Sequence, residues 1–349
     1  MHTVVADGSS PADAAAAKPA RVAVAGATGY TGQELLRLLT RHPSVALMAA
    51  MSSGATAARR LPAPARLWPG EITPLSPETL KAADVVFLAL PDAAAAELGP
   101  ALVDAGVRVI DLSGAFRLKH AAERARWYPE TRRVPAGTVY GLTEIEHAAV
   151  ADAKLVANPG CYPTATLLAL APVASAGLLL SNADIVVDAK SGVSGAGKTP
   201  SERTHFSECY GSLAAYGVFA HRHGAEIEQG VSAAGGAHPI TFVPHLVPLD
   251  RGILATMYFR VTPGTTEDTL SEVYQRAYAA APFVRLVGSS LPEIKHVAHT
   301  NFCDIGWRVD QSGRAVVVSV IDNLLKGASG QAVQNLNLML GVDERMGLW

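Results

Sequence analysis

Cys161 stands where a predicted strand turns into a predicted helix. Residues 155–157 form a short apolar run typical of a strand, residues 158–160 are Asn, Pro and Gly and predict a turn, and a helical run begins near Thr164. The thiol therefore lies close to the first free N–H groups of the helix, where the helix dipole favours negative charge. We expect it to ionise more readily than a free thiol and to act in covalent catalysis. The alternative is a small buried apolar side chain without chemistry.

Two histidines, His221 and His223, are candidates for an acid–base partner of this thiol. They would share one face if the run were a strand, an arrangement that also occurs in metal sites. No third ligand is evident, so we expect no metal. A histidine acting on a thiol is the better interpretation because its pKa lies near neutrality. The residues leave open which of the two acts, and a hydrogen-bonded structural histidine is the alternative for either.

A glycine-rich loop follows the first apolar run of the chain. Residues 21–25 predict a strand, Gly26, Gly29 and Gly32 follow at a spacing of three, and leucines at helical spacing come next. Strand, glycine loop and helix together are the arrangement that holds a dinucleotide pyrophosphate. The alternative is a glycine-rich turn without a ligand. We expect the cofactor to contact Gly26, Thr28, Gly29, Tyr30, Thr31 and Gly32.

The end of the second predicted strand, residues 45–50, favours NADP over NAD. An NAD site would normally show Asp or Glu there to bind the ribose hydroxyls, whereas this chain has Ser52 nearby. Arg59 and Arg60 follow and would suit a 2′-phosphate. A solvated pair of loop arginines is the alternative.

Further apolar runs at 84–90 and 107–111 alternate with a helical pattern. This alternation predicts an α/β fold with a parallel, doubly wound sheet whose ligand crevice lies at the carboxyl ends of its strands. Ser113 and Arg117 fall at that edge. The planar cation of Arg117 suits a phosphate, although a surface salt bridge is an equal alternative.

The second half of the chain predicts an α+β domain. A strand at 185–190 leads into a small-residue loop, 191–198, whose free N–H groups suit an anion or the nicotinamide end of a cofactor. A mobile surface loop is the alternative for this segment. Strands at 252–261 and 315–321 and helices at 266–281 and 328–340 follow, so we expect a mainly antiparallel sheet.

Composition excludes several classes of protein. The chain has 349 residues, enough for two domains, and its net charge of −2 argues against a nucleic-acid partner. It has no apolar run of about 18 residues, so we expect no membrane span. Three scattered cysteines offer neither a disulfide framework nor a structural zinc site, and the cytoplasm is the simplest compartment. Residues 1–20 are rich in Ala and Ser and are interpreted as a disordered tail.

As a set, these motifs resemble the N-acetyl-gamma-glutamyl-phosphate reductases, a family within the aspartate-semialdehyde dehydrogenase group. The resemblance runs from about residue 21 to 348, and its most specific motifs are residues 158–164 and 323–337. It implies a dinucleotide-binding domain, 21–160, completed by the terminal helix at 328–349, and a catalytic and oligomerisation domain, 161–327. It also implies a homo-oligomer, dimer or tetramer, and an NADP-dependent, phosphorylating reductase of arginine biosynthesis that works through a cysteine thioester.

The resemblance also implies roles for single residues. Cys161 would be the nucleophile and His223 the acid–base group. Arg117 and the 191–197 loop would lie near phosphates, and Glu226 would orient the substrate. The predicted substrate contacts are Arg117, Glu226 and Ser113, and the predicted cofactor contacts in the second half are Ser191, Gly192, Gly195 and Asn323.

Three positions depart from the family pattern. Gly224 and Ala225 replace the usual Thr-Pro between His and Glu, Thr143 replaces a Pro, and Gly114 replaces an Ala. None removes a reactive group. Two other functions stay open: reduction of another acyl phosphate, such as aspartyl phosphate, and a non-catalytic NADP-binding sensor.

Overall fold

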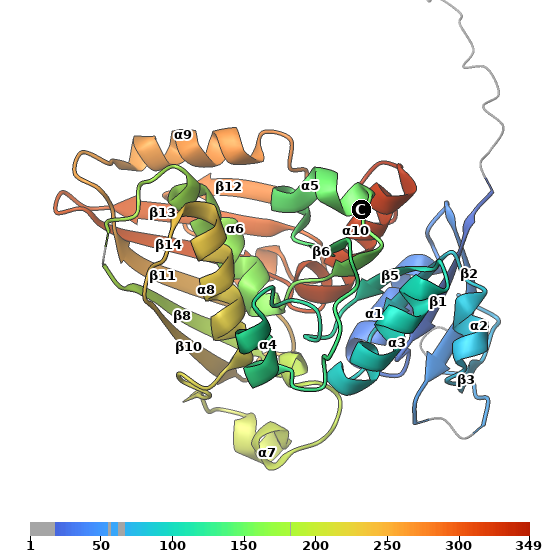
Figure 1. The fold of residues 1–349 in the computed structure, drawn as a ribbon. Helices are drawn as coiled ribbons and strands as arrows, with labels where there is room; N and C mark the ends of the chain where they lie inside the picture. Colours follow the sequence, from blue (N-terminus) through green and yellow to red (C-terminus); the bar gives the residue numbers. More distant parts are fainter. Residues whose placement is uncertain (1–17, 55–56, 62–66, 182) are drawn as a thin grey trace, which may run out of the picture.

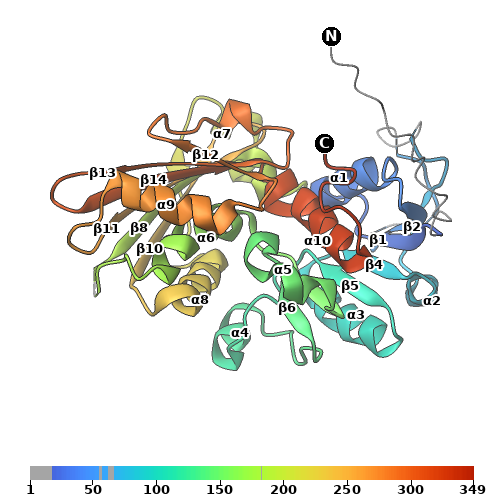
Figure 2. The ribbon, with the colours of Figure 1, turned by 90° about the horizontal axis from the view of Figure 1, so that it is seen from above.

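The computed structural model describes residues 18–54, 57–61, 67–181 and 183–349. Within them the chain forms two seven-stranded sheets that lie side by side, each with helices packed on it (Figures 1 and 2). Most of the predicted tail, residues 1–17, lies outside this description, and the first strand begins at Ala20. No described helix is long and apolar enough to cross a membrane.

The first sheet is parallel throughout, with strand order β3-β2-β1-β4-β5-β7-β6. The prediction of a doubly wound parallel sheet is confirmed. The strands are β1 (Ala20–Ala25), β2 (Val45–Ser52), β3 (Ile72–Pro74), β4 (Val85–Leu88), β5 (Arg108–Asp111), β6 (Thr138–Tyr140) and β7 (Leu155–Ala157). The helices of this half are α1 (Tyr30–Leu39), α2 (Pro77–Lys81), α3 (Asp92–Asp104), α4 (Ala121–Trp127), α5 (Thr143–Ala151) and α10 (Gly330–Leu340).

Both faces of this sheet are buried, which explains its continuous apolar strands. Alternate residues of β1 point to opposite faces. Val22 and Val24 share a core with α1 and α10, whereas Ala23 and Ala25 share another core with α3. The last helix of the chain thus packs back onto the first sheet. The predicted domain limits, 21–160 and 161–327, stay a proposal.

The second sheet is mixed and mainly antiparallel, as predicted. Its order is β12-β13-β14-β11-β8-β10-β9, and only the β8–β10 and β12–β13 neighbours among these described strands are parallel. The strands are β8 (Ile185–Gly192), β9 (Ala214–Ala215), β10 (Ile240–Val247), β11 (Ile253–Arg260), β12 (Val284–Gly288), β13 (Cys303–Val309) and β14 (Arg314–Ile321). Helices α6 (Cys161–Ser175), α8 (Arg222–Gly235) and α9 (Glu267–Tyr278) cover one face, and α6 supplies much of the shared core.

Some helix boundaries differ from the expectation. The helix expected near Thr164 begins at Cys161 itself. Residues 221–223 do not form a strand, so the two histidines do not share a strand face: His221 precedes a helix, and Arg222 and His223 are its first two residues. The helix expected from residue 328 begins as a π-helical turn, η4 (Leu325–Ser329), which continues into α10. Such π-helical turns are frequent at functional sites.

Candidate active site

The turn that carries Cys161 is fixed from several sides. Asn158 donates from its backbone N–H to the carbonyl of Asp111 at 2.8 Å, and its side-chain amide donates to the carbonyl of Ala328 at 3.1 Å. Its side-chain oxygen accepts from Asn335 of α10 at 3.1 Å. Gly160 then precedes α6 with no side-chain cap, so the first N–H groups of the helix stay free beside Cys161.

Two glycines make room around the thiol. A Cβ on Gly160 would lie 2.5 Å from Nε2 of His223, so the imidazole packs directly against this glycine. A Cβ on Gly327, in the π-helical turn, would lie 2.8 Å from Cβ of Cys161. The nucleophile candidate is therefore held between α8 on one side and the η4 turn on the other.

His223, Arg117 and Glu226 converge behind this turn. Nη1 of Arg117 lies 3.5 Å from Nε2 of His223 and 3.6 Å from Oε2 of Glu226. The remaining guanidinium nitrogens donate to the carbonyls of Asn158 and Leu112, each at 2.8 Å. Arg117 is 6% exposed and lies inside the site, so the alternative of a surface salt bridge is excluded by its burial.

Glu226 holds the start of the nucleophile's helix. Its Oε1 accepts from the backbone N–H of Gly160 at 2.8 Å and from the hydroxyl of Tyr140 at 2.7 Å. Its Oε2 is buried without a hydrogen-bond donor. Tyr140 was not among the predicted site residues, because its partner is 86 residues away and nothing local signals the contact.

The expected ease of ionisation of Cys161 is wrong for this structure. Burial raises the pKa of the Cys161 thiol to about 11, although the nearby charge of Arg117 lowers it. Burial also lowers the pKa of His223 well below its ordinary value, and His221, Arg117 and Arg222 add to this effect. Near pH 7 the pair therefore consists of a thiol and a neutral imidazole. The helix N-terminus does not outweigh the loss of water around the sulfur.

His221 lies before the first residue of α8 and does not share the position of His223. Its Nδ1 accepts from the backbone N–H of His223 at 3.1 Å and so caps α8. Its ring packs against the aromatic rings of Tyr162, Tyr216 and Phe242. In the described part of the chain no group of three or more His, Cys, Asp or Glu is arranged for a metal ion.

Ser113 is buried at the carboxyl end of β5, and its hydroxyl donates to Asp111 at 2.8 Å. Asp111 also accepts from the backbone N–H of Ser113 at 3.1 Å. These bonds shape the loop that leads to Arg117. A contact between Ser113 and substrate stays a prediction.

The glycine loop has the geometry that a bound pyrophosphate needs. Gly26 has φ of 93°, and a Cβ there would lie 2.0 Å from the carbonyl of Ala89. A Cβ on Gly32 would lie 2.2 Å from the carbonyl of Gly26, so this glycine lets α1 approach the strand. Gly29 precedes α1 without a side-chain cap, and a Cβ there would touch nothing closer than 3.8 Å. The free N–H groups of α1 are thus open to an anion.

The other predicted cofactor residues of the first half surround this loop. The hydroxyls of Thr28 and Ser52 are 3.0 Å apart, and Ser52 is buried at the end of β2. Tyr30 is exposed at the start of α1. The carbonyl of Thr31 accepts from Ser329 of the η4 turn at 2.9 Å. Because Gly327 of the same turn touches Cys161, this turn connects the glycine loop with the thiol.

The loop after β8 lies beside the same region. Lys198 donates to the carbonyl of Thr28 at 3.3 Å. Asn323 holds this loop by accepting from the N–H of Gly252 at 2.8 Å and donating to Ser194 at 3.0 Å. Ser191 is buried and donates to the carbonyl of its neighbour Gly192 at 3.1 Å. A Cβ on Gly195 would lie 2.7 Å from the Ser191 hydroxyl. Ser191, Gly192 and Gly195 thus lie in one segment, the end of β8 and the loop after it, and Asn323, from after β14, holds that loop through Ser194.

The structure shows the surroundings of three positions that depart from the family pattern, Thr143, Gly114 and Gly224. Thr143 donates to Asn335 at 2.7 Å, which in turn donates to Asn158 in the nucleophile turn. A Cβ on Gly114 would lie 2.1 Å from the ring of Tyr128, so this position has no room for a side chain. Gly224 has open space around it.

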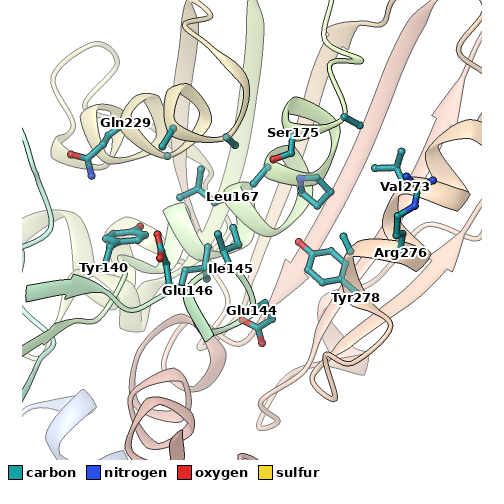
Figure 3. Close-up of a pocket in the computed structure, with 18 of the residues that line it drawn as sticks. Tyr140, Glu144, Ile145, Glu146, Leu167, Ser175, Gln229, Val273, Arg276 and Tyr278 are labelled. Carbon is teal, nitrogen blue, oxygen red and sulfur yellow. The ribbon is translucent and has the colours of Figure 1, made fainter. Parts of the chain in front are cut away.

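A separate cavity of about 480 Å³ lies among α5, α6, α8 and α9, and Figure 3 shows Tyr140 at one side of it. Cys161, His223 and Arg117 are not among its lining residues. The site is therefore recognised by its side chains and not by this cavity.

A half-buried cysteine at a helix start, a neutral histidine beside it and a dinucleotide loop, on this two-sheet fold, are the features of a semialdehyde dehydrogenase. Residues 21–153 match the family model described as semialdehyde dehydrogenase, NAD binding domain, and residues 161–323 match the one described as semialdehyde dehydrogenase, dimerisation domain.

Comparison with known sequences identifies a narrower family than the two family models do. The chain is 47% identical to the N-acetyl-gamma-glutamyl-phosphate reductase of Geobacillus kaustophilus and 45% identical to that of Bacillus subtilis. These matches cover 94% of this chain and 97% and 98% of the relatives. The chain belongs to the N-acetyl-gamma-glutamyl-phosphate reductase family.

Solved structures show the same fold at low sequence identity. An aspartate semialdehyde dehydrogenase II from Vibrio cholerae matches with a TM-score of 0.71 at 17% identity, over 93% of this chain and 99% of that one. An aspartate semialdehyde dehydrogenase from Candida albicans, solved with NADP, matches with a TM-score of 0.71 at 15% identity over the same shares.

Proposed function

We propose that this protein reduces N-acetylglutamyl 5-phosphate to N-acetylglutamate 5-semialdehyde and phosphate, a step of arginine biosynthesis, with Cys161 as nucleophile. The observation that carries the proposal is the packing of His223 against Gly160, beside Cys161 at the free start of α6. Relatives at 45–47% identity over nearly the whole chain support this substrate over aspartyl phosphate.

The pair of Cys161 and His223 begins the reaction. Neutral His223 accepts the thiol proton while the sulfur attacks the acyl carbonyl, forming the S–C bond. The bond between that carbon and the phosphate oxygen breaks, and phosphate leaves with its electron pair. A thioester then joins Cys161 to the acyl group. Thiolate suits this route because it is both a good nucleophile and a good leaving group.

The second half of the reaction returns the enzyme to its starting state. Bound NADPH would supply the hydride that reduces the thioester carbonyl. His223, now protonated, gives its proton to the oxygen on which charge develops. Collapse of the thiohemiacetal breaks the S–C bond and releases the aldehyde. The hydroxyl proton passes through His223 to the departing sulfur, which restores the thiol of Cys161 and the neutral imidazole. The nearby charge of Arg117 stabilises the negative charge that passes through this site.

Glu226 and Arg117 have related roles in this proposal. Glu226 fixes the N–H of Gly160 and balances the charge of Arg117. Arg117 supplies positive charge next to the departing phosphate. Ser113 stabilises the loop that precedes Arg117 and contributes to substrate binding. His223 is the acid–base group because it faces Gly160 and Arg117, whereas His221 caps α8.

NADP is the proposed form of the cofactor. The open N-terminus of α1 and the close contacts of Gly26 and Gly32 suit a pyrophosphate. No acidic side chain ends β2; Ser52 does, which leaves space for a 2′-phosphate. Arg59 and Arg60 follow within the next residues, and Arg60 lies 3.7 Å from Glu71. The 191–195 segment and Asn323 would hold the nicotinamide end near Cys161.

The proposed assembly is a homo-oligomer, dimer or tetramer, supported by the match to a dimerisation domain. The proposed compartment is the cytoplasm, which suits the three free cysteines.

Oxidation of NADPH with the candidate substrates tests the proposal. We expect N-acetylglutamyl phosphate to be reduced at least about a hundredfold faster, in kcat/KM, than aspartyl phosphate, and NADPH to be preferred over NADH. A preference for aspartyl phosphate would contradict the substrate assignment. NADPH binding without turnover of either substrate would favour the sensor.

A further inference from the structure

Residues 198–220 form an arm between two segments of the candidate site. It leaves the loop after β8, passes through η2 (Glu202–Thr204), α7 (Phe206–Cys209) and β9, and ends at His221. In Figure 1, α7 projects away from both sheets. The arm is joined to the rest of the second sheet by β9, a two-residue edge strand.

The arm exposes large apolar side chains to an unusual degree. Phe206, Tyr210, Leu213 and Phe219 are 70%, 71%, 58% and 76% exposed. Among the described residues, only Trp349 at the chain end is a large apolar residue of similar exposure. The rings of Phe206 and Tyr210 stack on each other at 5.0 Å and form one patch. Such patches mark interaction surfaces, and aromatic residues dominate their energetics.

The backbone conformation of the arm also indicates an interaction surface. Phe219 has φ of 56°, a left-handed conformation that is rare for a bulky residue. Its side chain is 76% exposed, so little of it packs against the described residues. Strained residues of this kind gather at functional segments.

The occupant that fits is a second copy of this chain. The arm lies wholly within residues 161–323, the segment that matches a dimerisation domain. Residues 198–220 contain two acidic and two basic side chains, so no net charge draws a nucleic acid or an anionic membrane. A two-fold interface brings the same patch from both subunits together, which a patch without net charge permits.

The ends of the arm touch the site. Lys198 reaches the glycine loop at Thr28, and the hydroxyl of Tyr216 lies 3.2 Å from that of Tyr162, the residue after Cys161. The ring of Tyr216 also packs against His221 at 5.6 Å. We propose that the arm docks onto a second copy of this chain and that this contact fixes the geometry at Cys161.

Replacing Phe206 and Tyr210 together with serine tests the proposal. Because both side chains are exposed, the fold is expected to survive, and circular dichroism checks this. We expect sedimentation velocity to show that the dissociation constant of the dimer is about a hundredfold higher in this double variant than in the wild type. Ile145→Ser is the matched control: Ile145 is 47% exposed on α5, outside the dimerisation match, and its substitution should leave the dimer unchanged.

The coupling to the site is tested by diluting each protein. On dilution, the specific activity of the wild type should fall as the fraction of monomer rises. The specific activity of the double variant should begin to fall at protein concentrations about a hundredfold higher than for the wild type. The activity measurement rests on the proposed function, whereas sedimentation does not. A wild type that is monomeric, or a double variant as tightly dimeric as the wild type, would overturn the docking surface. A monomeric variant with full kcat/KM would overturn the coupling.

Discussion

The reactivity of Cys161 is set by two opposing influences. Burial disfavours the thiolate and raises the pKa, whereas Arg117 and the start of α6 favour it. Because burial prevails, the proton must leave during the reaction, and the proposed acceptor is His223, which packs beside Gly160 and is neutral because burial lowers its pKa. Free thiolate is therefore scarce before substrate binds.

Alkylation of the free enzyme checks this state of the thiol. We expect the rate at which iodoacetamide labels Cys161 to rise about tenfold per pH unit from pH 7 to 10, without a plateau, because the pKa lies near 11. Cys161→Ser identifies the labelled site. A plateau below pH 8 would show an ionised thiolate and contradict the thiol–imidazole pair.

Replacing Gly160 with alanine tests the contact between His223 and the turn. The new Cβ would lie 2.5 Å from Nε2 of His223, so the ring must move. We expect kcat/KM to fall about a hundredfold, because displacements of about 1 Å have effects of that size. Gly224→Ala in α8 is the control, since its Cβ would meet open space. Equal activity of the two variants would contradict the assigned position of His223.

The sequence motifs predicted that these residues belong to one site, but they did not predict the environment of each side chain. Cys161, His223, Arg117 and Glu226 were named from their motifs, and the structure brings them together. The lowered pKa of Cys161 was wrong because burial depends on residues far away in the chain, such as Gly327. The bonds of Glu226 to Gly160 and Tyr140 span 66 and 86 residues, and no local pattern shows them.

Helix α8 must be held in place because its first turn carries His223. Arg222, its first residue, donates to Asp92 at 2.5 Å, and Asp92, the first residue of α3, also accepts from the N–H of Gly114 at 2.7 Å. The guanidinium of Arg222 lies over the ring of Tyr128. These contacts fasten α8 to the carboxyl edge of the first sheet.

Asp92→Asn and Arg222→Met should each lower kcat/KM about tenfold, because His223 loses its support. The pair is partly exposed, so thermal stability should change little. The double variant should be no worse than either single variant, since both act through one contact. Asp104→Asn, in the exposed pair with Arg133, is the control. Fully additive effects would contradict a shared role.

Helices and strands were predicted correctly where a local sequence pattern, such as an apolar run, was enough to identify them. The apolar runs of β1, β2, β4, β5 and β7 are nearly as predicted, since strands buried on both faces are continuously apolar. Helix α8 was not predicted, and its N-terminal cap is a histidine, His221, rather than one of the usual Ser, Thr, Asp or Asn residues. β9 has two residues, and it exists only through its pairing with β10.

The two halves of the molecule are joined through the end of the chain. The η4 turn touches the glycine loop and Cys161, and α10 packs on the first sheet. Lys326, a residue of this turn, is fully buried and donates to Glu144 of α5 at 2.5 Å and to Gln334 at 2.7 Å. Lys326 thus links the segment behind the nucleophile to α5.

Lys326→Met should lower the free energy of unfolding by about 3–5 kcal/mol, because Glu144 would be left buried without its partner. Adding Glu144→Gln should restore much of the loss, since the uncompensated charge disappears. Lys295→Met, in the exposed pair with Glu293, should cost less than about 1 kcal/mol. Urea unfolding followed by fluorescence measures all three. A loss for Lys326→Met no larger than for Lys295→Met would contradict the structural role of the buried pair.

Covalent capture of the acyl group by Cys161 is the step on which the proposed function depends. The most direct measurement mixes the enzyme with N-acetylglutamyl phosphate in the absence of NADPH and follows phosphate release and intact protein mass. We predict one phosphate per active site in a single rapid phase and one N-acetylglutamyl group on Cys161, with neither in Cys161→Ser; later NADPH should release the aldehyde. Steady turnover with NADPH, but no adduct and no phosphate release without it, would contradict the thioester.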